Sequence, residues 1–292
     1  MNFIAILVTL GLDRGLRHLE PLRDHRLGSW YFGLLKQIPA GSADLAWVLT
    51  VLAVILPALG VDGIQLGLAS LSPVLAFIAA VVFLLMSLGP RDAFHLIRQY
   101  RRAVEEKNHL AATRLARLLL EDAPPAGQQP CTEAVAEALL VRVNDRLFGP
   151  LFWFLVLGPS GAVLYWLSKN AVSTLRPKAS HETPCPHAEI ARRIHGVLAW
   201  IPAHLLALSY GLVGSFDSVW RVLREYYREC ELRFFENNDA VLACAGRGAI
   251  EAAGLDPDNC MGRLDRASVL ATRALVLWLV VIGLFTLGGW IL

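Results

Sequence analysis

Charged residues are scarce in this chain. Only 18% of its 292 residues are Asp, Glu, Lys or Arg, 55% are hydrophobic, and the mean hydropathy is +0.48. Ordinary soluble domains carry roughly 25% charged residues. The charge is not thinned evenly, because it is absent from four long blocks and dense between them. The uncharged blocks are Leu45–Val61, Gly63–Pro90, Leu147–Ser168 and Ala274–Leu292.

These blocks are long enough for membrane segments. A helix needs about 20 apolar residues to cross a hydrocarbon core of about 30 Å. A soluble core would need a partner surface for several such runs, which this chain cannot supply. Signals for strands are absent. The sequence therefore predicts an all-α, polytopic integral membrane helical bundle of about four or five membrane segments, with one candidate re-entrant segment and amphipathic cytoplasmic helices. We expect a single membrane domain over residues 1–292.

Basic residues in the loops predict the orientation. Residues 13–44 carry five Lys and Arg, residues 91–146 carry nine, and the link near Asp62 carries none. Since basic loops stay on the cytoplasmic side, we expect a cytoplasmic N-terminus. The same rule predicts a tight outer hairpin around Val61–Gln65.

Three further segments leave alternatives open. If Leu147–Ser168 spans the bilayer, the five basic residues of 169–193 lie outside, against the rule. If the block instead bends back at Gly158–Gly161 (GPSG), every basic loop stays inside. Gly196–Phe216 contains a proline and either spans or lies in the interface. Met1–Leu12 is too short to span and is predicted to be an interfacial helix.

Amphipathic helices are predicted between the blocks. The 91–123 segment shows helical spacing of apolar residues in two parts, with Asn108 as an N-cap between them. Another such helix is predicted over Ser218–Phe235. An odd number of scattered cysteines predicts reduced thiols rather than a disulfide framework. The five cysteines are Cys131, Cys185, Cys230, Cys244 and Cys260.

Known cofactor and metal motifs are missing. The chain has no GxxxxGK[ST], HExxH, GxSxG or CxxC pattern. His181, Cys185 and His187 offer three soft-metal ligands without a fourth, and we interpret them as ordinary loop residues. We therefore expect no cofactor, no metal and no nucleic acid partner.

Polar residues beside the apolar blocks are the candidate ligand-binding residues. Ionisable groups near membrane depth are costly and often mark a site. The alternative is that basic side chains snorkel at helix ends while Asp caps or pairs with them. For the histidine in the Trp-Ile-Pro-Ala-His run, the alternative is a hydrogen-bonded structural role. The candidates are Asp13, Arg14, Asp24, His25, Arg26, Asp145, Asn170 and His204.

Several motifs resemble one known family. Asp145–Trp153 (DRLFGPLFW) followed by Gly158–Tyr165 (GPSGAVLY) is similar to the core of the CobD/CbiB membrane proteins, and Trp200–Leu205 (WIPAHL) continues the match. Asn108–Arg114 (NHLAATR) fits the family's cytoplasmic loop. The resemblance implies the fold of the adenosylcobinamide-phosphate synthases. These enzymes of cobalamin biosynthesis attach an aminopropanol arm to the corrin.

The chain departs from that family at polar positions. Val141 and Arg142 stand where the family shows a Glu-Asn pair, and Arg146 stands where it shows Gly. Residues 169–173 lack the carboxylate of its Asn-Thr-x-Asp, and His204 replaces an Arg. Such carboxylates are suited to binding magnesium or to transferring protons, so their loss argues against the synthase activity.

The AmpE branch of the same superfamily is the nearer resemblance, because Leu22–Leu27 (LRDHRL) is similar to a polar segment of that branch. It implies a bacterial inner-membrane protein that modulates β-lactamase induction in response to cell-wall recycling, and it favours a role other than that of an enzyme. Its partners would be the lipid bilayer and a small anionic cell-wall-derived ligand or a membrane or cytoplasmic protein. The alternatives are an adenosylcobinamide-phosphate synthase-like enzyme and a transporter of a cell-wall intermediate.

Overall fold

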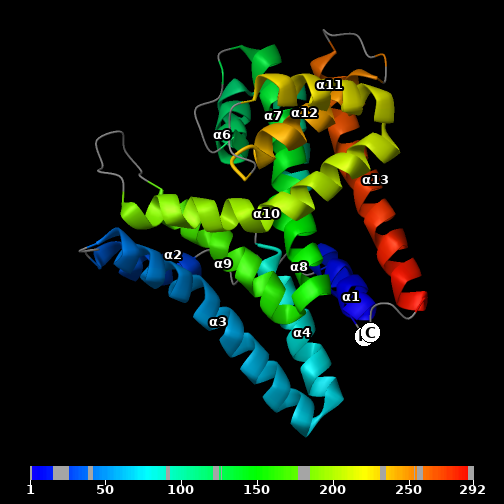
Figure 1. Cartoon of the computed structure of the whole chain (residues 1–292). Helices are drawn as coiled ribbons and strands as arrows, with labels where there is room; N and C mark the ends of the chain where they lie inside the picture. Colours follow the sequence, from blue (N-terminus) through cyan, green and yellow to red (C-terminus); the bar gives the residue numbers. More distant parts are fainter. Residues whose placement is uncertain are drawn as a thin grey trace. The chain divides into compact units, whose positions relative to one another are not determined.

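Helices make up the regular structure of this chain (Figure 1). The computed structural model describes residues 2–15, 26–38, 42–89, 93–120, 125, 127–176, 185–230, 235–252, 254 and 259–288. Within these ranges there is no strand, and three helices are long and apolar enough to cross a membrane. The predicted all-α membrane bundle is confirmed.

Contacts between residues divide the chain into two compact units that alternate along the sequence. Unit 1 comprises Met1–Pro90, Asp145–Trp200 and Gly283–Leu292. Unit 2 comprises Arg91–Asn144 and Ile201–Ile282. The single membrane domain over residues 1–292 stays a prediction.

The first two apolar blocks of unit 1 fold as one long and one short helix. Helix α3 (Ala43–Leu71) continues for 29 residues, about 44 Å at 1.5 Å per residue. Helix α4 (Pro73–Ser87) follows after Ser72, whose side chain accepts a hydrogen bond from the Val74 amide at 3.3 Å. The two helices meet at this turn in Figure 1.

The hairpin predicted around Val61–Gln65 is therefore wrong, since the turn lies at Ser72. Asp62 and the neighbouring glycines do not interrupt α3, because nothing there removes a backbone donor. Pro73 supplies the break, since its ring is accepted at the first position of a helix and Ser72 caps that end. Asp62 faces a cavity of about 590 Å³ lined by α1, α3 and α4.

The block Leu147–Ser168 bends back on itself. Helix α8 (Gly149–Leu157) ends at Gly158, whose φ of +71° suits glycine, and helix α9 (Pro159–Leu175) begins at the next residue. The two helices pack against each other (Figure 1). Since their far ends meet, the block is not one straight helix, and the bend lies at the Gly158–Gly161 position that the re-entrant alternative requires.

Helix α9 lies at the centre of unit 1. It packs against α2 (Arg26–Gln37), α3, α4 and α8, while α1 (Asn2–Gly15) packs against α4 and α8. Bulky side chains fill the space between α2, α3 and α9. This buried cluster contains Phe32, Leu35, Val54, Leu167, Ala171, Leu175 and Ala191.

Two more long helices complete the candidate spans. Helix α10 (Pro186–Val213) includes Pro202 and contributes residues to both units, and helix α13 (Cys260–Leu287) does the same. With α3 they are the three helices of spanning length and hydropathy in the described residues. The segment from 196 to 216 thus lies largely within a spanning helix.

Unit 2 holds the predicted amphipathic helices. Helices α5 (Ala93–Glu105) and α6 (His109–Leu120) are separated by Asn108, whose side chain accepts a hydrogen bond from the Ala111 amide at 3.1 Å. Both helices and the N-cap agree with the prediction. Helix α11 (Phe216–Glu229) covers most of the third predicted helix and packs on α12 (Asn238–Glu251), which in turn packs on α7 (Gln128–Val143). No disulfide joins the five cysteines, all of which are described.

Candidate functional site

Asp145 is the centre of a buried polar cluster in unit 1. It lies in η2 (Asn144–Phe148), a short π-helical turn between α7 and α8, and such turns are frequent at functional sites. Its Oδ1 accepts a hydrogen bond from the Tyr165 hydroxyl at 2.9 Å. Its Oδ2 lies 2.5 Å from the Lys169 ammonium, and the Nε2 of His195 lies 3.5 Å from Oδ1.

The α8–α9 hairpin produces this arrangement. Tyr165 and Lys169 are one turn apart on α9 and therefore share a face of that helix. Gly149 begins α8 beside the Tyr165 ring, where any larger residue would meet the ring and its hydroxyl. Gly161 lies against the carbonyl of Trp153, so the two helices approach closely at their other end. Close packing at both ends holds Tyr165 and Lys169 opposite Asp145.

His195 is oriented by Ser168. The Ser168 hydroxyl donates to the Tyr165 carbonyl at 2.7 Å, so it accepts the proton of His195 Nδ1 at 3.0 Å. The remaining ring nitrogen, Nε2, then faces Asp145. In this tautomer Nε2 carries a lone pair and is the ring nitrogen that can accept a proton, next to the Asp145 carboxylate.

The cluster keeps Asp145 ionised. Burial by itself raises the pKa of this carboxyl, but the neighbouring Lys169 ammonium outweighs it. The net result is a pKa well below the ordinary value. A buried carboxylate held in this state attracts cations and stabilises a neighbouring imidazolium, which are two properties of a site that handles amines and protons.

A second ion pair lies next to the cluster. Arg146 donates to Asp13 of α1 at 3.2 Å, and both side chains are nearly buried. Asn170 is also buried on α9, where its amide donates to the Trp166 carbonyl at 2.9 Å and its side chain packs against Gly28 of α2. Unit 1 thus brings Asp13, Asp145 and Asn170, all predicted from the sequence, into one group of packed helices.

The other predicted residues fall elsewhere. Asp24 and His25 lie outside the described residues, and the side chains of Arg14 and Arg26 do as well. His204 belongs to unit 2, where its Nε2 lies 2.8 Å from the Tyr227 hydroxyl.

Sequence reasoning did not single out His195 or Ser168 as site residues. His195 lies at the border of an uncharged run, directly before Gly196. Asp145 and Asn170 were predicted because they stand beside such a run. Applied to every titratable residue, the same criterion would have found His195 too. Ser168 carries no such signal, because serine is common at many positions and only the fold brings it to the imidazole.

Of the three candidate metal ligands His181, Cys185 and His187, the structure describes the last two. The ring Nδ1 of His187 lies 2.8 Å from the Thr50 hydroxyl of α3. His181 lies outside the described residues. Among the residues that the structure describes, no three His, Cys, Asp or Glu side chains converge as metal ligands would.

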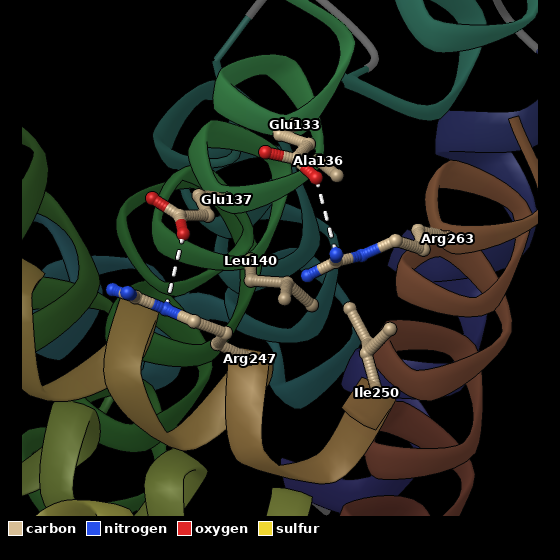
Figure 2. A pocket seen from close by; sticks show the side chains of 7 residues that line it. All are labelled: Glu133, Ala136, Glu137, Leu140, Arg247, Ile250 and Arg263. Carbon is tan, nitrogen blue, oxygen red and sulfur yellow. Dashed lines mark hydrogen bonds and ion pairs between the residues drawn. The ribbon is translucent and has the colours of Figure 1, made fainter. Parts of the chain in front are cut away.

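A second polar cavity lies in unit 2, between α7, α12 and α13 (Figure 2). Arg263 reaches Glu133 at 3.1 Å, and Arg247 reaches Glu137 at 3.2 Å, with Leu140 between the two pairs. Its volume is only about 100 Å³. The two acids and two bases offset each other, so this cavity suits a few water molecules rather than a charged substrate.

Comparison with known proteins identifies relatives. A sequence model of the CobD/Cbib protein family matches residues 25–250, which include the Asp145 cluster. The cobalamin biosynthesis protein CobD of Chromobacterium violaceum is 30% identical over 224 residues, 70% of each chain. That of Stutzerimonas stutzeri is 30% identical over 261 residues, 85% of this chain and 80% of the relative. A probable cobalamin biosynthesis protein CobD of Thermococcus kodakarensis is 26% identical over 206 residues, 67% of this chain and 64% of that one. No solved structure matches.

The expected role in β-lactamase induction is wrong, because these relatives are named for cobalamin biosynthesis. Membership of the AmpE branch is not confirmed. The expectation took the missing carboxylates at 141–142 and 169–173 as evidence of a lost site. In the fold, Asp145 is instead surrounded by Tyr165, Lys169 and His195, so a polar cluster persists without those positions.

Proposed function

The chain belongs to the CobD/Cbib protein family, and we propose that it acts in cobalamin biosynthesis as a synthase that attaches an aminopropanol arm to the corrin. The ionised Asp145 cluster is the observation that carries this proposal. Attaching an amine to an acid forms a C–N bond and breaks a C–O bond of the carboxyl group, whose oxygen leaves with the phosphoryl group of a nucleoside triphosphate that activates the acid. The amine must first lose its proton to become a nucleophile. A site for this step needs an anion to attract the ammonium group and a base to deprotonate it.

Asp145 and His195 fill these two roles in the proposal. The carboxylate attracts the ammonium group of the incoming amine, and His195 Nε2 takes its proton. Ser168 fixes the imidazole through Nδ1, and Asp145 stabilises the imidazolium that forms. Tyr165 and Lys169 hold the carboxylate in place. Asp13 and Asn170 belong to the adjoining helices α1 and α9, and Arg146 pairs with Asp13 beside the cluster.

The basic loops assign the membrane side. The N-terminal region and residues 91–146 are rich in Lys and Arg, so we place the N-terminus in the cytoplasm. In this orientation the two ends of the α8–α9 hairpin, and the Asp145 cluster with them, face the cytoplasm, from which soluble substrates arrive.

Complementation of a cobalamin-auxotrophic strain that lacks its synthase tests the proposal. The wild-type chain should restore growth without added cobalamin. His195→Gln should reduce product formation about 10²–10⁴-fold in membranes supplied with the corrin acid and aminopropanol substrates. Glu137→Gln is the control for Asp145→Asn, because it makes the same acid-to-amide change at the polar cavity of unit 2, and it should keep the activity.

Two further outcomes decide the test. Asp145→Asn should also lose activity, and membrane content and thermal stability of each variant separate loss of chemistry from loss of fold. The proposal fails if well-expressed wild-type chain does not complement, or if His195→Gln and Asp145→Asn both complement as well as the wild type.

A further inference from the structure

A groove of about 550 Å³ lies between α10 and α11 in unit 2. Helix α11 lines it with residues three and four apart, so that one whole face of the helix takes part. This face carries Phe216, Val219, Trp220, Leu223, Arg224, Tyr227 and Arg228. Helix α10 contributes His204, Leu208 and Gly211 with the same spacing. The groove is therefore lined by one face of each of the two helices.

The groove is polar at one end and apolar at the other. His204 and the Tyr227 hydroxyl lie 2.8 Å apart, which marks the polar end. Arg224 and Arg228 flank Tyr227 on the same face of α11. At the other end, a β-carbon added at Gly211 would touch Phe216 and Val219.

The side chains at the apolar end are exposed when no lipid or other molecule covers the groove. Phe216 stacks on Trp220 with ring centroids 6.3 Å apart, yet these residues are 50% and 60% exposed. Leu208 of α10 is 48% exposed. Because α10 is a candidate membrane span, such side chains are suited to contact with acyl chains. Trp and Arg together are typical of the boundary between acyl chains and headgroups.

The charge of the lining selects the headgroup. Two arginines and no acidic residue line the groove. In the described part of the chain, neither Arg224 nor Arg228 forms a salt bridge with a carboxylate. The acidic residues of α11, such as Asp217 and Glu225, lie off the lining face. An anionic phosphate is therefore the complementary group.

We propose that this groove binds an anionic phospholipid, with its phosphate at Arg224 and Arg228 and an acyl chain along Leu208, Gly211 and Trp220. The proposal concerns unit 2 and does not depend on the catalytic role assigned to Asp145. An amphiphile satisfies both ends of the groove at once, whereas a free phosphate would leave the aromatic end uncovered.

Lipid retention by the purified full-length chain tests the proposal. The protein in detergent micelles is titrated with phosphatidylglycerol or phosphatidylcholine, and bound lipid is counted by native mass spectrometry. Arg224→Gln and Arg228→Gln should each weaken phosphatidylglycerol binding roughly fivefold, the equivalent of about 1 kcal/mol per basic residue. Arg221→Gln is the matched control, because Arg221 lies on the same helix but does not line the groove.

A second variant tests the apolar end without changing charge. Gly211→Leu would place its side chain toward Phe216 and Val219 and should displace the acyl chain with both arginines present. Unchanged elution and melting temperature show that each variant is folded. The proposal is overturned if phosphatidylcholine binds equally well, if Arg221→Gln weakens binding as much as Arg224→Gln, or if Gly211→Leu has no effect. Displacement of the lipid by millimolar inorganic phosphate would also overturn it, in favour of a phosphate site.

Discussion

Replacing Gly149 by alanine should disrupt the Asp145 cluster from a position that carries no functional group. A β-carbon at this position would meet the ring and the hydroxyl of Tyr165. Tyr165 is fully buried, so its ring has little room to retreat. The ring must therefore shift, and its hydroxyl must leave the Asp145 carboxylate that now lies 2.9 Å away.

The size of the effect follows from three contributions. Overpacking a buried site costs about 1–3 kcal/mol. A lost hydrogen bond to a charged group costs about 1.5–3 kcal/mol. Replacing glycine by alanine in a helix raises the free energy of unfolding by at most about 1 kcal/mol. The steric and hydrogen-bond costs exceed this gain, so Gly149→Ala should lower the free energy of unfolding by about 1.5–5 kcal/mol, a fall in melting temperature of roughly 3–20 °C.

A double-mutant cycle measured by thermal unfolding in detergent checks the mechanism. In a Tyr165→Leu background the ring and hydroxyl are gone, so Gly149→Ala should cost less than about 1 kcal/mol. Gly67→Ala in α3 is the control, because no atom lies within reach of its added methyl group, and it should raise the melting temperature by at most about 4 °C. If Gly149→Ala costs the same in both backgrounds, the contact with Tyr165 is not the cause and the reasoning fails.

Two other predictions concern acid stability and topology. Because the native pKa of Asp145 lies below its unfolded value, its contribution to stability is present above about pH 4 and is lost as the pH falls further. The melting temperature of the wild-type protein should therefore fall more steeply than that of Asp145→Asn between roughly pH 5 and pH 3. Parallel curves for the two proteins would contradict this. In a cysteine-free background, Lys36→Cys and Arg176→Cys should react with an impermeant thiol reagent added to one side of the membrane. Ser70→Cys, beside the α3–α4 turn, should react only from the other side. Labelling of all three from one side would contradict the α3–α4 hairpin.

Some features of the fold were predictable because their causes are local. Asn108 separates two helices because its own side chain satisfies the Ala111 amide three residues later. The break at Gly158 is encoded by a glycine that adopts a positive φ next to a proline that begins a helix. The α3–α4 turn was also local, at Ser72-Pro73, but the charge of Asp62 drew the prediction ten residues too early, because a charge inside an apolar run does not by itself break a helix.

The shortage of charge that marks this sequence was enough to determine an all-α membrane protein, since burying uncharged runs in lipid depends only on composition and length. The order of its motifs was enough to indicate the family. Neither could show which titratable groups meet. Asp145 contacts His195 across 50 residues because α8 and α9 fold back and α10 packs beside them, and Ser168 matters only because that packing brings it to the imidazole. Such contacts are decided by tertiary structure, because the energy that keeps a carboxylate ionised comes from neighbours that are distant in sequence.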